Sequence, residues 1–494
     1  MTTTASAPSE TRTYQQFIDG QWADAASGAT FERTSPYDGH VVATYPNGGM
    51  EDAQRAIEAA RRVFDEGKWS NSPARERSKI LRDAADLIMA NRDELSRSIS
   101  EEVGKPLNIA KGEVAMTAEV LQYFAGKALD LKGEAITQEV ADAVGLIVHE
   151  PVGVVGIITP WNFPLLLISW KIGPAIAAGC TMVAKPSHYT PGCALILARL
   201  LSEAGLPDGV FNVVTSETDN GALVGQHLAS SEQVDKIAFT GSTTSGKAVM
   251  RAAANNVKKL SLELGGKSPN IVFADAAVDA AVAGAFFGIY LNSGQVCQAG
   301  SRLLVSNSIK DEFVEKLMNM GKGLKLGNPL EPTTTMGPLI NENQLKKVEG
   351  YITAGKQEAT LLMGGNRPNG ELSNGLFVEP TIFDGVSNDA TIAREEIFGP
   401  VLSVLSFDDL DDVIRTANDT MYGLAAAVWT KDINVAFKVA RGLRAGTVWV
   451  NAYHGTGLAQ MPYGGYKQSG IGRELGGSGL EEYMETKSIQ IKLR

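Results

Sequence analysis

Stretches typical of β-strands alternate with stretches typical of helices from about residue 144 onward, and this alternation limits the possible fold more than any other feature of the sequence. The strand-like stretches cover 144–160, 181–186, 210–215 and 234–241, and helical composition separates the last three. Strands that alternate with helices form βαβ units, which build a parallel sheet covered by helices. The sequence therefore predicts an α/β fold.

A second series of the same kind follows in the C-terminal half. Its strand-like stretches are 268–274, 301–306, 379–386, 399–407, 425–430 and 446–451. Because 494 residues exceed what one hydrophobic core usually holds, we expect a second α/β domain. The last stretch, 488–494, is strand-like but has no partner nearby in the sequence, and such a strand often completes a sheet in another domain or subunit.

The overall composition argues against several classes of protein. The net charge of −11 argues against a nucleic-acid partner, which clustered lysines and arginines would bind. Three cysteines give no disulfide framework and indicate a reducing compartment, and the five histidines lack the spacing of metal ligands, so we predict no metal site. The polar N-terminus lacks the apolar core of a signal peptide, and the apolar runs are shorter than the roughly 20 residues of a membrane helix. We therefore expect a soluble, cytoplasmic protein with a disordered tail at 1–13.

One cysteine differs from the other two in its surroundings. Cys180 and Cys193 lie in apolar or helical stretches, where core packing is the expected role, whereas Cys297 lies among small and polar residues in NSGQVCQAGSR at 292–302. Such surroundings indicate access, and the thiolate is a nucleophile. A thiol with an ordinary pKa is only about 3% thiolate at pH 7, so a nucleophilic cysteine needs a base or another source of activation. Core packing remains the alternative role for Cys297.

Three other motifs have both a chemical and a purely structural interpretation. The turn FTGSTTSG at 239–246 lies between a strand and a helix, where glycines let the backbone approach a pyrophosphate, or it is a plain tight turn. Asn162 in TPWNFP is a possible amide donor to a developing oxyanion, or it satisfies backbone groups in a rigid turn. Glu263 precedes Gly265 and Gly266, which would leave a general base flexible and open to water, or it is a turn residue.

Taken together, these stretches resemble one enzyme family. TPWNFP, FTGSTTSG, ELGGKSPNIVF, GQVCQAGSR, EEIFGPV and PYGGYKQSGIGRE occur in the order found in the NAD(P)-dependent aldehyde dehydrogenase superfamily, and they resemble its non-acylating, hydrolytic branch. The resemblance extends from about Tyr14 to the C-terminus. Each motif alone is weak, but six in order are very specific.

The resemblance implies a reaction through a covalent intermediate. Cys297 is expected to attack the aldehyde carbon, and the Asn162 side chain and the Cys297 backbone N–H are expected to hold the oxyanion of the thiohemiacetal. Hydride transfer to the nicotinamide would leave a thioester, which water activated by Glu263 would hydrolyse. Lys171 and Glu474 match positions of a proton path in some members of the family, with a surface ion pair as the alternative.

The resemblance also implies a cofactor, NAD or NADP. The positions that match its binding residues are Thr159, Trp161, Lys185, Ser187, His188, Gly221, Gly225, Gly241, Ser242, Glu396 and Phe398. In relatives that prefer NAD, a glutamate that repels a 2′-phosphate commonly stands where this chain has His188. We therefore expect useful activity with NADP.

The expected substrate is a small aldehyde. The positions that match the family's substrate tunnel are Phe163, Leu167, Trp170, Leu291, Val296, Gln298, Leu458 and Tyr463. Their mostly apolar and aromatic character favours a medium aliphatic or aromatic aldehyde. No arginine stands among them to hold a carboxylate, and they do not suggest an aromatic cage for a quaternary ammonium group.

The family fold implies a division into domains. It comprises a Rossmann-type cofactor domain at 14–128 and 152–262, an α/β catalytic domain at 263–476, and a small β oligomerisation arm at 129–151 and 477–494. The C-terminal strand would pair across a subunit interface in a homodimer or homotetramer. Three alternatives remain: an acylating enzyme that uses coenzyme A, a thiol hydrolase without cofactor, and a protein of this fold without catalytic activity.

Overall fold

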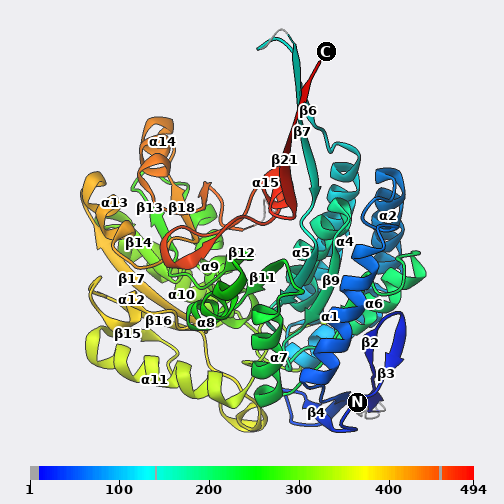
Figure 1. Ribbon diagram of the computed structural model, residues 1–494. Coiled ribbons are helices and arrows are strands. Elements are labelled where there is room, and N and C mark those ends of the chain that lie inside the picture. Colours follow the sequence, from blue (N-terminus) through cyan, green and yellow to red (C-terminus); the bar gives the residue numbers. More distant parts are fainter. Residues whose placement is uncertain (1–10, 140–141, 455–458, 494) are drawn as a thin grey trace.

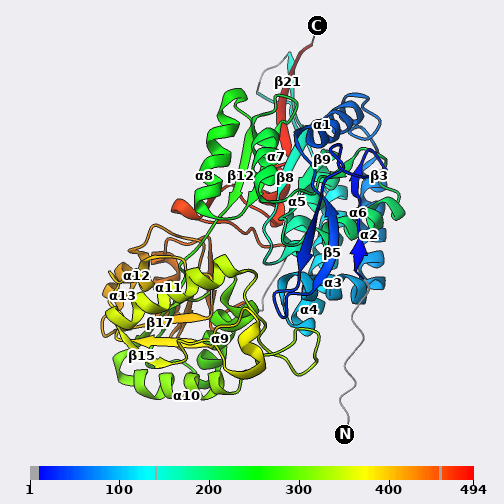
Figure 2. The ribbon, with the colours of Figure 1, turned by 90° about the horizontal axis from the view of Figure 1, so that it is seen from below.

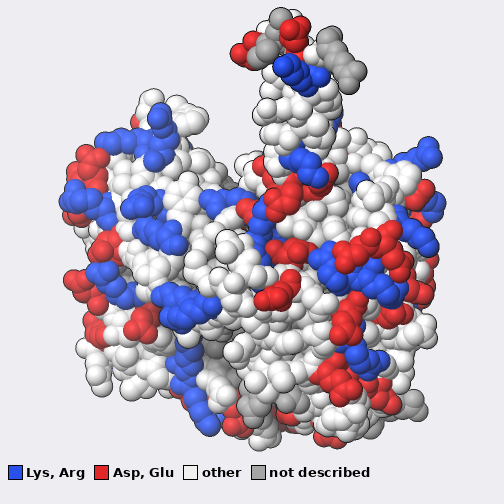
Figure 3. All heavy atoms as spheres, in the orientation of Figure 1, with Lys and Arg blue, Asp and Glu red and all other residues white. Residues whose placement is uncertain are grey.

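The protein consists of two α/β lobes and a narrow β-arm that projects away from both (Figures 1 and 2). The computed structural model describes residues 11–139, 142–454 and 459–493, with backbone alone at 218–220. Among these residues, no helix is long and apolar enough to cross a membrane. On the face drawn in Figure 3, acidic and basic side chains are interspersed over both lobes.

The first lobe is built on a sheet of eight strands. In spatial order they are β20 (Gly470–Ile471), β12 (Lys259–Glu263), β11 (Lys236–Thr240), β8 (Val154–Ile158), β9 (Thr181–Lys185), β10 (Phe211–Val213), β2 (Gln16–Ile18) and β3 (Gln21–Ala23). The five strands from β12 to β10 are parallel, and β20, β2 and β3 add antiparallel edges. The central strands are buried on both faces, as expected for a parallel sheet covered by helices.

Helices pack against this sheet, and their apolar faces form its two cores. They are α1 (Met50–Asp65), α2 (Ala74–Ala90), α3 (Arg92–Val103), α4 (Leu107–Leu129), α5 (Pro164–Ala178), α6 (Gly192–Glu203), α7 (Thr218–Ser230) and α8 (Thr243–Ala252), followed by the short turn η1 (Ala253–Asn256). Cys180 and Cys193 are fully buried in the larger core, which confirms the packing role predicted for both.

The second lobe has a sheet of seven strands. In spatial order they are β15 (Thr360–Met363), β16 (Thr381–Asp384), β17 (Val401–Phe407), β14 (Arg302–Ser306), β13 (Pro269–Val272), β18 (Ala425–Trp429) and β19 (Thr447–Val450). All neighbours are parallel except β15 and β16. Its helices are α9 (Val278–Tyr290), α10 (Lys310–Lys322), α11 (Glu342–Glu358), α12 (Thr391–Arg394), α13 (Leu410–Asn418) and α14 (Ile433–Gly442), with the 3-10 turns η2 (Leu291–Gly294), η3 (Asn307–Ile309), η4 (Gly370–Asn374) and η5 (Lys467–Ser469). These strands confirm the second α/β series predicted from the sequence.

Two small sheets complete the fold. One contains β1 (Arg12–Thr13), β5 (Val41–Pro46) and β4 (Thr30–Thr34), and the other forms the arm from β21 (Met484–Lys492), β7 (Ala143–Pro151) and β6 (Glu134–Ile136), with α15 (Gly476–Glu481) at its base. One edge of β21 pairs along its whole length with β7 of the same chain. For this edge, the prediction that the terminal strand pairs across a subunit interface is wrong.

Two further sequence predictions need correction at their boundaries, and a third predicted boundary can be placed relative to β12. The disordered tail predicted for 1–13 extends too far, because Arg12 and Thr13 pair with β5; residues 1–10 lie outside the described part of the chain. The helix predicted after the 239–246 turn begins earlier, because Ser242 caps α8 and the following residues already form its first turn. The domain boundary predicted at 262/263 lies one residue before the end of β12.

The relation between the two large sheets places the functional groups. The chain passes from the carboxyl end of β12 in the first sheet directly to the amino end of β13 in the second. The segments that follow β8, β9 and β11 therefore meet the segments that precede β14 and β17. A crevice at the carboxyl ends of parallel strands is the usual position of a ligand site in open α/β sheets.

Candidate active site

A cavity of about 990 Å³ opens at the carboxyl ends of β8, β9 and β11. Its lining contains every residue that the sequence predicted for cofactor binding: Thr159, Trp161, Lys185, Ser187, His188, Gly221, Gly225, Gly241, Ser242, Glu396 and Phe398. The lining continues to Asn162, Leu167 and Cys297 at the other end. We call the two ends of this cavity the cofactor end and the nucleophile end. The fold thus brings segments more than 200 residues apart into one site.

The cofactor end has the features of a phosphate and ribose site. Gly241 and Ser242 form the turn from β11 into α8, and the Ser242 hydroxyl accepts a hydrogen bond from the Ser245 N–H at 3.1 Å. The N-terminal N–H groups of a helix attract anions. On α7, a Cβ at Gly221 would lie 3.2 Å from Lys185 Cε, so a larger residue there would press against the lysine. These features fit a dinucleotide.

Burial shifts the pKa values of two titratable groups at the rim of the cofactor end. Burial lowers the pKa of Lys185 to about 8. Burial also lowers the pKa of His188 to about 4, and the positive charges of Lys185 and Arg33 lower it further. His188 is therefore a neutral imidazole at neutral pH, and it adds no negative charge to this rim.

Glu396 and Phe398 connect the two ends of the cavity. One Glu396 oxygen accepts a hydrogen bond from the Gly266 N–H at 3.1 Å, and a Cβ at Gly265 would collide with the same carboxylate. Phe398 has φ 59°, an uncommon value for a bulky residue, and its ring meets Trp161 edge-on with centroids 5.3 Å apart. Backbone strain of this kind concentrates at ligand sites.

The residues before Cys297 form an unusual left-handed turn. Asn292, Ser293 and Gly294 all have positive φ, at 49°, 57° and 73°. The Ser293 hydroxyl donates to the Gly337 carbonyl at 2.7 Å, and the Gln295 side-chain oxygen accepts from the Ile340 N–H at 3.0 Å. The 337–340 segment therefore fixes the turn that presents Cys297 to the cavity.

The Cys297 thiol is held in its neutral form. Its Sγ lies 3.7 Å from the Tyr463 hydroxyl. Burial raises the pKa of Cys297 to about 12, and the carboxylates of Glu396 and Glu263 raise it further, while the tyrosine contact acts in the opposite direction. Cys297 therefore depends on activation even more than an exposed thiol does.

Asn162 and Glu263 approach this end from the first sheet. Asn162 follows β8, and its side-chain amide donates to the Gln295 carbonyl at 3.1 Å, so it contacts the segment that carries Cys297. Glu263 ends β12 with an exposed fraction of 2%, and neither of its side-chain oxygens has a hydrogen-bond partner among the described residues. Burial raises the pKa of Glu263 well above its ordinary value, and Glu474 raises it further.

The surroundings of Glu263 correct one argument made from the sequence. Its two following glycines do not leave the carboxyl group open to water. They are required because neighbouring groups lie close: a Cβ at Gly266 would lie 2.6 Å from the Cys297 carbonyl oxygen, and Gly265 faces Glu396. A Cβ at Gly464 would lie 2.7 Å from Glu263 Oε1.

Lys171 and Glu474 form a buried ion pair, so the alternative of a surface pair is wrong. Both side chains are fully buried, and Lys171 Nζ lies 2.6 Å from Glu474 Oε1. Lys171 also donates to the Thr240 hydroxyl at 2.7 Å, beside the cofactor turn. The charge of Lys171 lowers the pKa of Glu263, and the charge of Glu474 raises it.

Of the predicted substrate residues that the structure describes, Leu167 lines the cavity, and the others pack in the cores or in side-chain contacts near Cys297. Trp170 and Tyr463 meet edge-on with centroids 4.9 Å apart, and Phe163 packs against the same core as Cys297. Leu291 and Val296 pack in the core of the second lobe, and Gln298 Nε2 lies 2.8 Å from His454 Nδ1. Leu167 lines the cavity itself. Leu458 lies outside the described residues.

Comparison with known proteins decides the family. A model of the Aldehyde dehydrogenase family matches residues 22–489. The chain belongs to the aldehyde dehydrogenase family. It is 49% identical to the betaine aldehyde dehydrogenase of Bacillus subtilis over 96% of each chain, and 45% identical to the human mitochondrial aldehyde dehydrogenase over 97% of this chain and 92% of that protein.

Solved structures of this family share the fold of both lobes and the arm. An NAD-dependent aldehyde dehydrogenase from Sinorhizobium meliloti superposes with a TM-score of 0.95 at 46% identity, covering 97% of this chain and 95% of that one. Betaine aldehyde dehydrogenase from Staphylococcus aureus in complex with NAD+ gives 0.94 at 46% identity, with the same coverage. The predicted α/β fold and the predicted resemblance to aldehyde dehydrogenases are both confirmed.

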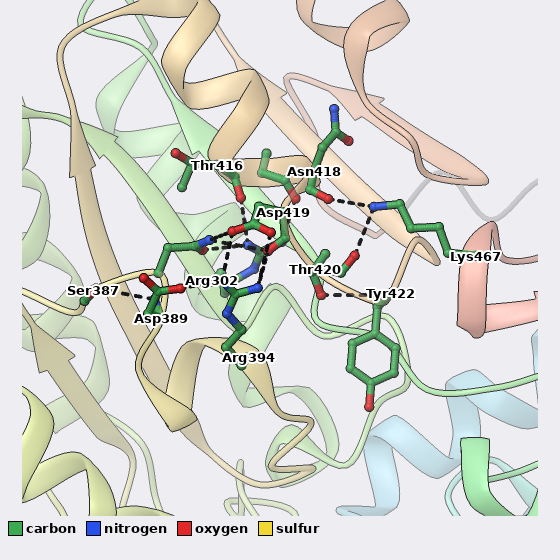
Figure 4. Close-up of polar contacts among 12 residues, drawn as sticks. Arg302, Ser387, Asp389, Arg394, Thr416, Asn418, Asp419, Thr420, Tyr422 and Lys467 are labelled. Atoms are coloured by element: carbon green, nitrogen blue, oxygen red, sulfur yellow. Dashed lines mark hydrogen bonds and ion pairs between the residues drawn. The ribbon is translucent and has the colours of Figure 1, made fainter.

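A second polar network fixes the far side of the Cys297 segment. Arg302, the first residue of β14, is fully buried and donates to the carbonyl oxygens of Lys267, Thr416 and Ala417 at 3.0, 3.1 and 2.8 Å. Figure 4 shows how Arg394 and Lys467 continue this network around residues 416–420, at the end of α13. Five residues after Cys297, the chain is thus tied to two separate backbone segments, at Lys267 and at Thr416–Ala417.

Sequence reasoning missed several residues at the site. Gln344 and Lys347 line the cavity from α11, and Arg251 lines it from the end of α8. Lys105 and Glu113 lie behind Asn162. Polar residues on a helix usually mark a solvated face, so the pattern gave no signal for the first three; the only signal for Lys105 was its position between a glycine and a proline. No group of three or more His, Cys, Asp or Glu residues that suits a metal occurs among the described residues.

Proposed function

We propose that this chain oxidises an aldehyde to its carboxylic acid with NAD or NADP, through a thioester on Cys297. The supporting observation is the meeting of Cys297, Asn162 and the 990 Å³ cavity at one end, with Glu263 and the Lys171–Glu474 pair directly behind. The cavity is large enough for a dinucleotide, and its glycine turn at the N-terminus of α8 suits a pyrophosphate. The bound cofactor supplies the hydride acceptor.

The first step is attack by Cys297 on the aldehyde carbon. The thiol proton must leave, because burial holds the thiol neutral, and Glu263 is the proposed acceptor. The aldehyde oxygen gains negative charge as the C–S bond forms. The Asn162 side-chain amide and the Cys297 backbone N–H stabilise this charge as preorganised donors.

The second step removes the acyl group with water. After the hydride has left the thiohemiacetal carbon and Glu263 has passed on the proton from the thiol, Glu263 takes a proton from water, which attacks the thioester and releases the carboxylate and the neutral thiol. The proton then passes from Glu263 toward Lys171 and Glu474, a buried ion pair whose charges influence the pKa of Glu263. The presence of Glu263 favours hydrolysis over acyl transfer to coenzyme A, because a general base at this position activates water as the acyl acceptor.

Betaine aldehyde is the first candidate substrate. The relatives at 49% and 46% identity are named betaine aldehyde dehydrogenases, and the edge-on pair of Trp170 and Tyr463, with Phe163 nearby, supplies aromatic faces beside Cys297. Aromatic faces attract quaternary ammonium groups by about 0.5–2 kcal/mol. This modifies the expectation from the sequence, in which the substrate positions did not suggest an aromatic cage for a quaternary ammonium group. A medium aliphatic or aromatic aldehyde is the second candidate, supported by the mostly apolar side chains of the same wall.

One substrate pair separates these candidates. Betaine aldehyde and its uncharged tert-butyl isostere have the same shape, so their kcat/KM ratio isolates the attraction of the positive charge. We expect a ratio of roughly ten or more in favour of betaine aldehyde, which Trp170→Leu abolishes and Trp170→Phe largely keeps. A ratio near one in the wild-type protein would favour the uncharged aldehyde.

We further propose that the protein acts as a homodimer or homotetramer in the cytoplasm. The arm supports an oligomer, because β21 is an edge strand whose residues 485–492 are all exposed in the single chain. Exposed strand edges invite pairing with another chain. Light scattering of the purified protein, with and without residues 484–494, tests this proposal: the full chain should be oligomeric and the shortened chain should not.

A further inference from the structure

A buried ion pair lies behind the proposed oxyanion donor and has no part in the reaction described above. Lys105 follows Gly104, which ends α3, and precedes Pro106, which begins α4; Glu113 lies on α4. The two side chains form an ion pair, and both are fully buried. Burying two charges is expensive in free energy unless their remaining hydrogen-bonding groups are also satisfied.

The partners of this pair all belong to the segment that carries Asn162. Lys105 Nζ donates to the Asn162 carbonyl oxygen at 2.8 Å and lies 3.7 Å from the centre of the Phe163 ring. Glu113 Oε1 accepts the backbone N–H groups of Leu165 and Leu166 at 3.0 and 3.2 Å, in the first turn of α5. The pair therefore fixes the backbone directly before and directly after Pro164.

Asn162 is held from two sides as a result. Its backbone carbonyl accepts from Lys105 and, at 3.2 Å, from Asn292 Nδ2, while its side-chain amide donates to the Gln295 carbonyl. Asn292 lies in the left-handed turn before Cys297, and Gln295 follows this turn directly. Rotation of the Asn162 peptide would move its side-chain amide relative to the nucleophile.

We propose that Lys105 and Glu113 are positioning residues that fix the Asn162 amide, and with it the oxyanion site, relative to Cys297. This proposal rests on the proposed function, in which Asn162 is the oxyanion donor. The competing explanation is that the pair only stabilises the junction of α4 and α5. The two explanations differ in whether the effect of removing the charges passes through Asn162.

The double variant Lys105→Met/Glu113→Gln removes both charges and retains the acceptor for Leu165 and Leu166. We expect the rate of the first NADH burst to fall roughly 10- to 100-fold, because displacement of a catalytic group by about 1 Å has this effect. The dissociation constant for NAD should stay within about twofold, since the pair does not line the cavity. Lys111→Met, the same substitution at a partly exposed position on α4, is the matched control and should leave the burst rate unchanged.

A double-mutant cycle with Asn162→Ala decides between the two explanations. If the pair acts through Asn162, removing the charges should change the burst rate less than twofold or so in the Asn162→Ala protein. An undiminished 10- to 100-fold loss in that background would overturn the positioning role. If Asn162→Ala alone kept the wild-type burst rate, the oxyanion role in the proposed function would fail instead.

A milder variant covers the case in which the double variant does not fold. Glu113→Gln alone keeps the acceptor for α5 and leaves the lysine in place, but it removes the negative charge beside Lys105. We expect a roughly three- to tenfold loss of burst rate, which should again disappear in the Asn162→Ala background. Loss of thermal stability without a change in burst rate would show a purely structural pair.

Discussion

The two ends of the cavity differ in how closely their groups are enclosed. At the nucleophile end, Glu263 is 2% exposed, the Cys297 thiol is held neutral by burial, and the segment that carries the cysteine is tied down on both sides. At the cofactor end, His188 is half-buried at the rim of the cavity, and the surface available to a cofactor is divided among many lining residues. Each group at the enclosed end has its own task, so single substitutions there should have the larger effects.

The largest effect is expected at Cys297. Cys297→Ser should lower aldehyde oxidation by about a thousandfold or more, because the serine hydroxyl cannot supply the thiolate that attacks the aldehyde. Steady-state NADH formation measures the loss, and cofactor binding measured by fluorescence should be nearly unchanged. Cys193→Ala is the control, since that buried thiol only packs in the core. Activity within tenfold of the wild type would remove Cys297 as the nucleophile.

The next effect separates the two steps of the reaction. With Glu263→Gln, rapid mixing should still show an NADH burst, whereas steady turnover should fall by roughly 10²- to 10³-fold because the thioester persists. Mass spectrometry of the quenched protein should then find the acyl group on Cys297. Normal cycling of this variant would place the base elsewhere. Coenzyme A restoring turnover of the unmodified protein where water fails would favour the acylating alternative.

The enclosure of the nucleophile also predicts a pH dependence. Because burial raises the pKa of Cys297 to about 12, the thiolate fraction without cofactor should increase with pH throughout the range from neutral to mildly alkaline. Alkylation of Cys297 by iodoacetamide should therefore accelerate roughly tenfold per pH unit, without levelling off below about pH 9. A plateau near neutral pH would mean that a neighbouring group already ionises the thiol in the free protein.

Sequence reasoning succeeded where local pattern and residue type determine structure. Strands β8 to β11 of the first large sheet, β13, β14 and β16 to β19 of the second, and the turn before α8 all follow from apolar runs and glycine positions. It failed where distant segments meet. The partner of β21 is β7, more than 300 residues earlier; the resemblance placed both segments in one arm, but no local signal in the sequence identified their pairing.

The same division applies to the site. Cys297 was distinguished by its polar neighbours, Asn162, Glu263 and the 239–246 turn were candidates from their local motifs, and the resemblance to aldehyde dehydrogenases supplied the remaining ones. The reason for Gly265 and Gly266 could not be predicted, because it depends on Glu396 and the Cys297 carbonyl approaching from elsewhere in the chain. Lys105 and Glu113 were missed for the same reason, since their partners lie around the start of α5.

The smallest effect is expected at the cofactor end, where a substitution should change the preference between NAD and NADP and leave the chemical steps unchanged. His188 is neutral, since burial lowers its pKa to about 4, and Lys185 beside it has a pKa of about 8, so the rim offers a 2′-phosphate no repulsion. Loss of one like-charge contact at a partly exposed position is worth about 1–2 kcal/mol, or roughly tenfold in relative affinity. We therefore expect useful activity with NADP, comparable with NAD, and a shift toward NAD in His188→Glu. The ratio of kcat/KM for the two cofactors measures this, with His188→Gln as the uncharged control. A wild-type preference of about a hundredfold for NAD that stays the same in His188→Glu would show that other residues at this end govern the choice.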